Sequence, residues 1–581
     1  MKTRSLFFLF YLLVYGAQAQ QDVELDALLF QKIPTRDGIN LSADIYKPHQ
    51  MEKPLPAIMV LTPYGANEKV DRAMYFARRG YVFVTVDCRG RRHSEGTFTP
   101  FEDDGKDGYD AVEWIAKQPW CNGKVGMMGG SYRGMVQWMT LKNFPPHLKS
   151  IVPTASVGPG IDFPKRNGMF YKYAARWLAL VNGKSQNDAL FGAVDYWQQK
   201  ELNAFKNHLP YQDFAQYSGS NVRVFKKWVA HPDFDAYWKQ FYPTSQNYQK
   251  INIPILTITG HYDADQPGAL HYYKQHMQHG NQAARQNHYL IIGPWSHGGT
   301  RKPAKSLGKL KFGDNAVIDI NKLHLDWFDW TLKGKANAKP TFLKDRVAYY
   351  EMGDNQWRYQ PILKSFSDKN LTLYLDSKNG EANNIGHPAW LTTDKPSNTT
   401  NKPDHFVYDP LDQSVTKDWA TQISLAKKNY VIYQSKPLTE DIVVTGHLKA
   451  ELYLSLNTKD TDLLIVAYEV TPDGETNFLR NDILRARYRT SLEKSTLVKP
   501  GKVLLYTLDK AWYFSKKIKK GSAIRLMIGA LDWTSYQHNY NSGKDVSKET
   551  KRDAQTCTVK VYHSAQYPSR LVLPLDTNPK K

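Results

Sequence analysis

The sequence predicts an α/β fold, an α/β-hydrolase with a helical cap insertion, followed by an all-β jelly-roll domain. Short apolar runs alternate with helical patterns in the first part of the chain, which is typical of a parallel sheet with helices on both faces. After about Val347 the apolar residues recur with period two in short runs separated by turns, which favours a β-sandwich. With 581 residues the chain is too long for a single core. We therefore expect more than one folded domain.

Residues 1–19 have the pattern of a signal peptide. Lys2 and Arg4 precede an apolar run from Leu6 to Val14, and Ala17-Gln18-Ala19 offers a cleavage site of small residues. A membrane anchor needs about 20 apolar residues, and this run is shorter. We therefore expect a secreted or periplasmic protein without stable membrane insertion.

The composition is that of a globular protein. Hydrophobic residues make up 41% of the chain and the mean hydropathy is −0.56, which excludes a disordered chain and a membrane-embedded one. The formal net charge is +21, but the basic residues are scattered and no nucleic-acid motif accompanies them. We expect a solvated basic surface and no nucleic-acid partner.

Cysteine usage and motif searches argue against disulfides and cofactors. The three cysteines, Cys88, Cys121 and Cys557, are too few for a disulfide scaffold. Cys88 and Cys121 are expected at opposite ends of the parallel sheet, too far apart to bridge. The sequence contains no HExxH motif, phosphate loop, dinucleotide fingerprint or internal repeat. We expect a reaction that needs no metal and no cofactor.

The hydrolase is predicted in two parts, residues 20–157 and 251–345. An antiparallel hairpin is expected first, from Leu28 to Pro34 and from Asn40 to Lys47. Parallel strands are expected at residues 57–61, 81–86, 125–128, 150–152, 254–259 and 288–292. Helices are expected at residues 71–79, 104–118, 132–142, 268–279 and 319–331.

Ser131 lies at the apex of a predicted strand-turn-helix. The apolar run from Val125 to Met128 leads into Gly129-Gly-Ser131, and a helical pattern follows. This is the layout of a nucleophile elbow, whose tight turn requires small residues next to the serine. Gly129 and Gly134 supply them, and Arg133 stands where the commoner elbow has its second glycine. A capping serine in an ordinary tight turn is the alternative interpretation.

Residues 158–250 carry no strand signal and are rich in aromatic residues, among them Trp177. We expect a helical cap over the active end of the sheet. An aromatic-lined cap suits an acyl group or a ring, although most of these side chains should serve packing.

An acid and a histidine follow the last two strands of the hydrolase. Asp263 and Asp265 lie just beyond one strand, and His297 lies beyond the next. Since the carboxyl ends of parallel strands share one edge, all should meet Ser131 there. The order Ser, Asp, His is that of the α/β-hydrolases. Asp263 is the expected triad acid because it is nearer the strand end, with Asp265 in reserve.

Residues 346–581 are predicted to form the jelly roll. Alternating strands are expected at residues 371–375, 431–433, 442–445, 448–456, 463–470, 503–508, 523–528 and 559–562. The loops containing Asp460-Thr-Asp462 and Asp532 to Asn541 have too few and too irregularly spaced carboxylates for a calcium cage. We expect them to be structural.

These residues together resemble one family. Tyr64 in Thr-Pro-Tyr-Gly, Ser131 in Gly-Gly-Ser-Tyr-Arg-Gly, Asp263 in Gly-His-Tyr-Asp and His297 in Gly-Pro-Trp-Ser-His are similar to the cocaine-esterase and X-Pro dipeptidyl-peptidase superfamily of serine hydrolases. That superfamily also includes α-amino-acid ester hydrolases and glutaryl-cephalosporin acylases. The resemblance extends through residues 231–238 and 406–410, and so covers nearly the whole mature chain.

The resemblance implies roles for these residues. Ser131 is the implied acylated nucleophile, with His297 and Asp263 completing the triad. The implied oxyanion hole combines the hydroxyl of Tyr64 with the backbone N–H of Tyr132. One departure is the stretch from Arg89 to Gly96, where the family has a glycine near Arg92. We assign that loop no catalytic role.

The sequence leaves the substrate open between an ester, an amide and an X-Pro peptide. A dipeptidyl-peptidase must hold an ammonium group, for which Asp233, Asp235 and Asp265 are candidates, whereas Arg133 would favour an acidic acyl group. Trp177 is a candidate for the acyl pocket. A secreted glycan-binding protein with a vestigial hydrolase domain is a further alternative. The expected partner is a small-molecule or short-peptide acyl substrate, and homo-oligomerisation stays open.

Overall fold

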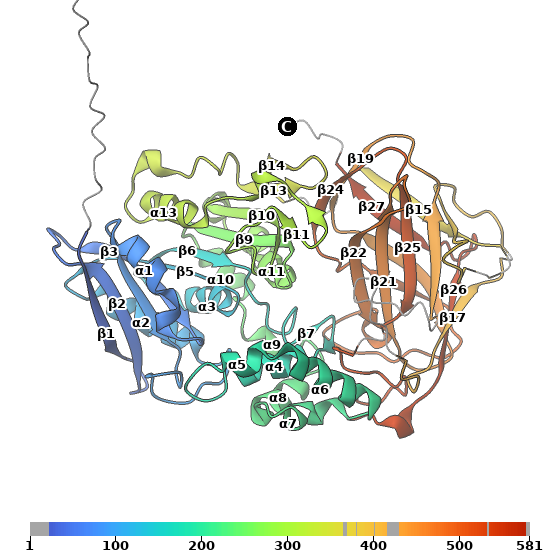
Figure 1. The fold of residues 1–581 in the computed structure, drawn as a ribbon, viewed down its shortest axis with the longest axis horizontal. Helices are drawn as coiled ribbons and strands as arrows, with labels where there is room; N and C mark the ends of the chain where they lie inside the picture. The colour runs from blue at the N-terminus through green and yellow to red at the C-terminus, as the bar shows by residue number, and fades with distance from the viewer. Residues whose placement is uncertain are drawn as a thin grey trace, which may run out of the picture.

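The computed structural model in Figure 1 has three parts: an α/β part, a helical part below it and a β-rich part beside both. The structure describes residues 23–576, apart from 364–368, 379, 381, 400, 415–428 and 532–533. The predicted signal peptide, residues 1–19, lies outside the described residues. In the described part of the chain, no helix is long and apolar enough to cross a membrane.

The α/β part is built on a ten-stranded sheet with the order β1-β2-β4-β3-β5-β6-β9-β10-β13-β14. The strands from β4 to β13 in this order are parallel, and β1, β2 and β14 run antiparallel to their neighbours. Their bounds are β1 Leu25–Pro34, β2 Asn40–Pro48, β3 Leu55–Thr62, β4 Val82–Asp87, β5 Cys121–Gly130, β6 Leu148–Thr154, β9 Ile255–Tyr262, β10 His288–Ser296, β13 Val347–Glu351 and β14 Gln356–Gln360. The predicted hairpin and parallel strands are thus confirmed.

Helices cover both faces of this sheet because its central strands are apolar on both faces. Met59 and Leu61 of β3 pack in one core cluster with residues of α2 and α3, and Ile58 and Val60 pack in another with residues of α1 and α13. The helices are α1 Val70–Ala77, α2 Asp104–Ala116, α3 Tyr132–Leu141, α11 Gln266–His279, α12 Gln282–Gln286 and α13 Ile320–Thr331. The arrangement is that of an α/β-hydrolase.

The sheet extends further along the chain than the sequence predicted. We placed the end of the hydrolase at residue 345, but β13 pairs in parallel with β10 and β14 pairs with β13. The sheet therefore ends at Gln360. A run with period two indicates a strand without showing which sheet the strand joins, and the predicted boundary therefore puts residues 346–360 in the all-β domain.

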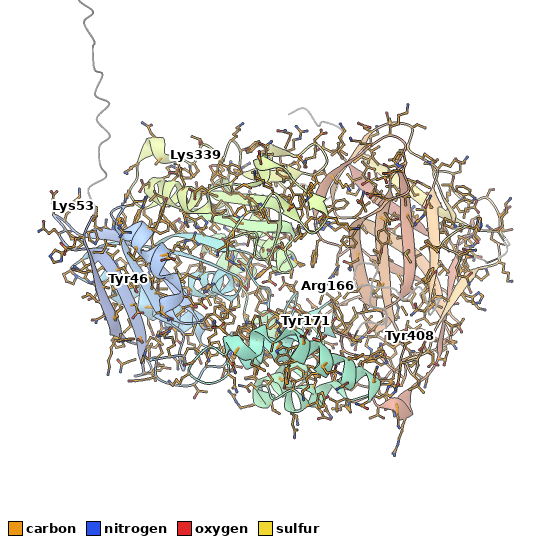
Figure 2. All side chains as sticks on the ribbon, viewed as in Figure 1. Tyr46, Lys53, Arg166, Tyr171, Lys339 and Tyr408 are labelled. Atoms are coloured by element: carbon orange, nitrogen blue, oxygen red, sulfur yellow. The ribbon has the colours of Figure 1, made fainter. Side chains whose placement is uncertain are left out.

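Residues 158–250 form a mainly helical cap. Its helices are α4 Tyr173–Leu180, α5 Asp188–Gly192, α6 Val194–Lys206, α7 Phe214–Tyr217, α8 Val222–Val229, α9 Ala236–Lys239 and α10 Ser245–Lys250, with the short strands β7 Lys165–Arg166 and β8 Met169–Phe170. Figure 2 labels Arg166 and Tyr171 where the cap meets the β-rich part. There Arg166 lies 3.5 Å from the carboxylate of Asp482, and Tyr171 forms a β-bridge with Tyr536.

The β-rich part contains thirteen strands in one hydrogen-bonded set, counted over the described residues. They are β15 Lys369–Asp376, β16 Ala389–Thr392, β17 Asp404–Tyr408, β18 Tyr430–Ser435, β19 Ile442–Gly446, β20 Lys449–Leu456, β21 Asp462–Val470, β22 Thr476–Arg485, β23 Leu504–Leu508, β24 Phe514–Ile518, β25 Ala523–Ala530, β26 Cys557–Tyr562 and β27 Arg570–Leu575. The predicted all-β domain is therefore present, and its jelly-roll connectivity stays a prediction. Cys88, Cys121 and Cys557 are all free and buried.

Candidate active site

Ser131 sits in a strained turn between β5 and α3. Its backbone has φ 65° and ψ −128°, in a region that residues with a Cβ seldom adopt, and its N–H donates to the carbonyl of Thr154 at 2.9 Å. A Cβ on Gly129 would lie 2.6 Å from Cβ of Arg133, and one on Gly134 would lie 2.7 Å from Oγ of Ser156. The turn therefore needs both glycines, and it presents a partly exposed serine at the edge of the sheet.

His297 and Asp263 meet at the same edge. Nδ1 of His297 lies 2.8 Å from Oδ1 of Asp263. Asp263 is fully buried, its Oδ2 accepts the hydroxyl of Thr259 at 2.8 Å, and its Oδ1 also accepts the backbone N–H of Asp265 at 3.1 Å. Because both oxygens are held, this carboxylate can fix the tautomer of the imidazole.

Asp265 is a second acid beside the same histidine. Its Oδ2 lies 3.5 Å from Nδ1 of His297, and the Ser131 hydroxyl is close enough to lower its pKa. Burial outweighs these effects and raises the pKa of Asp265 to about 6. For His297, burial lowers the pKa, but the carboxylates of Asp265 and Asp263 outweigh burial and raise it.

Within the described residues, Ser131 makes no hydrogen bond to His297 in this conformation. Catalytic hydrogen bonds are often long before substrate binds. The ligand atoms of Asp263, Asp265 and His297 lie within 4.8 Å of one another, a spacing that also suits a cation. A metal ion there would displace the hydrogen bond between His297 and Asp263.

Tyr64 follows β3, and its ring lies 5.0 Å from the guanidinium of Arg133, two residues after Ser131. Its phenol oxygen accepts the indole N–H of Trp177 at 3.0 Å, and its own N–H donates to the hydroxyl of Thr62 at 3.1 Å. Burial raises the pKa of Tyr64, so the phenol is neutral at pH 7. With Trp177 as the donor to its oxygen, Tyr64 keeps its proton available for another acceptor.

The side chain and the backbone of Tyr132 have separate surroundings. The phenol donates to the carboxylate of Asp104 and accepts the backbone N–H of Phe101 at 2.8 Å, which anchors the ring in the core. The ring stacks on Trp177 with centroids 5.4 Å apart. The backbone N–H belongs to the first residue of α3, where no preceding helical carbonyl is available to accept it.

The two cap acids proposed from sequence as ammonium ligands have other partners. Asp233 accepts the hydroxyl of Tyr488 at 2.8 Å. Asp235 caps α9 through the N–H of Tyr237 at 3.0 Å, and its other oxygen lies 2.7 Å from Nδ1 of His231. Asp235 is thus a helix cap and Asp233 joins the cap to the β-rich part, and ammonium binding by either acid stays a prediction.

Residues that sequence reasoning did not assign also support the site. Arg91 is fully buried, its Nε donates to the carbonyl of Pro63 at 2.8 Å and its Nη1 to the carbonyl of Val181 at 2.6 Å. It therefore ties the segment before Tyr64 to the cap. Arg92 has a φ of 41°, the left-handed conformation that explains why a glycine was expected there. In the sequence, the basic run Arg91-Arg92-His93 stands out, but nothing in the sequence shows which groups these side chains contact.

The two carboxylates of the loop Asp460-Thr-Asp462 are paired with arginines, whereas Asp532 of the other loop lies outside the described residues. Asp462 makes a two-pronged contact with Arg485 at 2.8 Å, and Asp460 lies 2.7 Å from Arg487. The amide of Asn539 joins the two carboxylates. Guanidinium groups thus stand where a bound cation would have to stand, which agrees with the structural role expected for these loops.

Comparisons with known proteins cover most of the chain. Residues 37–299 match the X-Pro dipeptidyl-peptidase (S15) family, and residues 343–572 match the X-Pro dipeptidyl-peptidase C-terminal non-catalytic domain. Cocaine esterase of Rhodococcus sp. (strain MB1 Bresler) is 28% identical over 584 residues, which cover 94% of this chain and 97% of the esterase. The Xaa-Pro dipeptidyl-peptidase of Lactobacillus delbrueckii subsp. lactis is 27% identical over 146 residues, or 22% of this chain and 17% of that enzyme.

Solved structures share the whole fold. An α-amino acid ester hydrolase has a TM-score of 0.79 at 23% identity and covers 97% of this chain and 98% of its own. An aminopeptidase from a marine sediment archaeon, Thaumarchaeota archaeon, has a TM-score of 0.78 at 22% identity, with 96% and 97% covered. The two family matches, the full-length relative and the shared fold agree, and the chain belongs to the cocaine-esterase and X-Pro dipeptidyl-peptidase superfamily of serine hydrolases.

Proposed function

We propose that this protein hydrolyses an ester or amide acyl bond through a covalent acyl intermediate on Ser131. The observation that carries the proposal is the pair formed by His297 and Asp263, with 2.8 Å between Nδ1 and Oδ1, beside a serine whose φ is 65°. A serine in a strained turn, a histidine and a buried acid are the groups that serine hydrolases use to activate a hydroxyl.

The reaction needs two acyl transfers. Nε2 of His297 takes the proton of Ser131 as Oγ bonds to the carbonyl carbon, and then gives it to the departing oxygen or nitrogen as that bond breaks. The acyl group is now an ester of Ser131. A water molecule, deprotonated by the same histidine, attacks this ester and regenerates the serine. Asp263 holds the imidazole in the required tautomer and stabilises the imidazolium.

We assign the oxyanion hole to two donors. The hydroxyl of Tyr64 is the first, because its oxygen already accepts the Trp177 N–H and its proton is free to face the negative oxygen. The backbone N–H of Tyr132 is the second, because it starts α3 directly after the nucleophile. One such donor is worth roughly 3 kcal/mol of barrier.

Ester hydrolysis is the favoured activity. Cocaine esterase aligns over nearly the full length of this chain, whereas the Xaa-Pro dipeptidyl-peptidase of Lactobacillus aligns over about a fifth of it. An X-Pro peptidase must also hold an ammonium group one residue beyond the proline, about 4 Å further from the scissile carbonyl than an α-amino group. Asp233 and Asp235, the two cap acids considered for an ammonium group, contact Tyr488 and His231.

Asp265 favours a second candidate, a substrate with a free α-amino group. Its carboxyl lies beside Ser131 and, with a pKa of about 6, is mostly ionised at neutral pH. An α-ammonium group lies within two bonds of the acyl carbon and so within reach of this acid, whereas the ammonium of an X-Pro peptide lies further away. The X-Pro dipeptidyl-peptidase and the glycan-binding protein with a vestigial hydrolase domain are kept as outcomes of the test.

We also propose export to the periplasm or the medium on the basis of residues 1–19. The expected mature chain begins at Gln20, which N-terminal sequencing of the secreted protein checks. Light scattering of the same material measures whether the protein forms a homo-oligomer.

The proposed activity is tested by assaying the mature protein and its Ser131→Ala variant on four substrates. These are a p-nitrophenyl acyl ester, a glutaryl anilide, a phenylglycine methyl ester and a Gly-Pro anilide. We expect ester turnover that the variant loses. Preference for the phenylglycine ester would select the α-amino substrate class, and cleavage of the Gly-Pro anilide would select the exopeptidase. Absence of turnover on all four, with a folded protein, would contradict the proposal.

A further inference from the structure

Four basic side chains gather beside the nucleophile: Lys69, Arg72, Arg133 and Arg301. The guanidinium of Arg133 lies 5.0 Å from the centre of the Tyr64 ring. Arg301, four residues beyond His297, packs against the backbone next to Ser131, since a Cβ on Gly130 would lie 2.8 Å from its Nη1. Arg133 therefore lies beside Tyr64 of the proposed oxyanion hole and Arg301 beside the turn of Ser131, and the charge of Arg133 acts on Lys69 and Arg72.

Direct contacts provide little negative charge for these cations. Glu68 lies 2.9 Å from Nη1 of Arg133 and 3.5 Å from Nζ of Lys69. Nη2 of Arg72 lies 2.7 Å from Nδ1 of His324, and burial keeps that imidazole neutral by lowering its pKa. The backbone N–H of Arg301 donates to the carbonyl of Gly298 at 3.1 Å, but its guanidinium has no hydrogen bond or ion pair with any residue that the structure describes. Four cations thus share one carboxylate in direct contact.

Several N–H groups of the four basic side chains also lack a hydrogen-bond acceptor. Nε of Arg72, Nε of Arg133 and Nη1 of Arg301 are buried without a hydrogen-bond partner among the described residues. An unpartnered buried N–H costs about 1 to 3 kcal/mol. Burial and then the charge of Arg133 lower the pKa of Arg72 to about 10, that of Lys69 to about 8 and that of Arg301 below its usual value.

The two acids next to His297 do not form ion pairs with the four cations. Asp263 and Asp265 attract Arg301 electrostatically, but both lie against Nδ1 of His297. Lys69, Arg72 and Arg301 are partly exposed, so a ligand in solution can reach the cluster. Concentrated positive charge with open donors is stabilised by an anion, and the planar fork of arginine matches a carboxylate.

We propose that this arginine cluster binds a carboxylate carried by the substrate, with Arg301 as its main ligand. The inference deepens the proposed function and rests on it, because the bound carboxylate would place the scissile carbonyl at Ser131. The carboxylate belongs either to the acyl half, as in a dicarboxylic monoester, or to the leaving group, as in an ester of a hydroxybenzoate. Both sources present the same chemistry, and the experiment separates them.

Two matched substrate pairs test the proposal. The acyl pair is p-nitrophenyl hydrogen glutarate and its uncharged glutaramate analogue, and the leaving-group pair is 4-acetoxybenzoate and 4-acetoxybenzamide. The wild type should prefer the carboxylate in one pair by at least about tenfold in kcat/KM after correction for uncatalysed hydrolysis. Arg301→Met should reduce that preference about tenfold, and Arg301→Lys should restore part of it. The preference should fall with added salt.

Lys302→Met is the control, because it removes the same charge from the neighbouring exposed residue. It should leave the preference unchanged. The proposal is overturned if the wild type prefers neither carboxylate, or if Arg301→Met lowers both members of a pair by the same factor. The latter result would indicate a structural role for Arg301.

A binding measurement separates failure of this inference from failure of the proposed reaction. Calorimetry on Ser131→Ala protein with glutarate and with 4-hydroxybenzoate needs no turnover. We expect one of the two anions to bind, and its affinity to fall at least about tenfold when Arg301→Met is added. Absence of binding by both, or equal affinity in the two proteins, would overturn the carboxylate site even if Ser131 proves to be the nucleophile.

Discussion

The indole N–H of Trp177, in the cap, donates to the phenol oxygen of Tyr64, in the hydrolase, at 3.0 Å. One lone pair of the phenol is thereby occupied, and the phenol proton is directed to another acceptor. The cap therefore contributes to the proposed oxyanion hole without touching the reacting atoms, and Trp177, considered from sequence as part of the acyl pocket, gains a positioning role.

Trp177→Phe removes this N–H and keeps an aromatic ring to stack on Tyr132. We expect kcat for an ester to fall about tenfold with a smaller change in KM, because the misdirected phenol stabilises the transition state less. Tyr64→Phe should lower kcat by about 10²- to 10³-fold. Steady-state kinetics of both variants and of the double variant check this, since the double variant should be no slower than Tyr64→Phe. Multiplicative losses would contradict the positioning role.

The choice between two acids is testable at His297. Asp263 is fully buried and makes the shorter contact, 2.8 Å against 3.5 Å for Asp265. Asp263→Asn should lower kcat by about 10³- to 10⁴-fold because it favours the wrong imidazole tautomer. Asp265→Asn should cost less than about tenfold on a neutral acyl ester. The reverse order in kcat would assign the triad to Asp265.

The same Asp265→Asn protein should show a shifted pH profile. The active histidine is neutral, and the charge of Asp265 is the largest effect that raises the pKa of His297 against burial. Its removal lowers that pKa, so the acidic limb of kcat/KM should move to lower pH. A limb that stays in place would mean that Asp265 does not act on the imidazole.

Arg91 is predicted to position Tyr64 from the opposite side. Its guanidinium joins the carbonyls of Pro63 and Val181. Arg91→Lys keeps the charge but removes the planar guanidinium that donates to two carbonyls. We expect this change to lower kcat about tenfold when Tyr64 is present and to change kcat little in a Tyr64→Phe background. Comparison of the two backgrounds measures this, with thermal unfolding to confirm the fold. Equal losses in both would indicate that Arg91 acts elsewhere.

Stability should fall in mild acid because several histidines are buried and neutral. Burial lowers the pKa of His276 to about 4, below the unfolded value of 6.5, and its Nδ1 lies 2.9 Å from Nδ1 of His288. Between pH 6.5 and 4 the unfolded chain binds more protons, so the free energy of unfolding falls as pH falls. Each unit of depressed pKa accounts for up to about 1.4 kcal/mol.

Chemical unfolding of the wild type and of His276→Gln between pH 7.5 and 4.5 checks this. The variant should be less stable at pH 7.5 and should lose less stability on acidification. Buried acids such as Asp104, whose pKa burial raises to about 7, have the opposite effect on stability as the pH falls. Their effect is the same in both proteins, so it cancels in the difference between the two free energies of unfolding. Parallel curves for the two proteins would contradict a neutral His276.

The parallel sheet was predictable because strands such as β4 are buried at every position and therefore mostly apolar, with Val82, Phe83, Val84 and Val86 in a row of six. The strand β22 was missed because it buries Arg480, Asn481 and Asp482, which break the apolar alternation. Those side chains are satisfied by contacts with other parts of the chain, including Asn167 of the cap. A local pattern cannot show a partner that is 315 residues away in the chain.

The candidate site was predictable where chemistry and chain order coincide, as at Ser131, Asp263 and His297. The roles of Asp233 and Asp235 were not, because an acid near a predicted pocket looks the same whether it caps a helix or faces a ligand. Arg301 gave no signal, since a single arginine in a loop is unremarkable until the structure shows that its buried Nη1 has no hydrogen-bond partner among the described residues.

The account depends most on a nucleophile at Ser131, and covalent labelling tests it directly. The mature protein would be treated with a fluorophosphonate and digested, and the modified peptide identified by mass spectrometry. We predict one label per chain, on Ser131, formed at least about a hundredfold more slowly in a folded His297→Ala variant. A label on another residue, or none on a folded wild-type protein, would contradict the proposed mechanism.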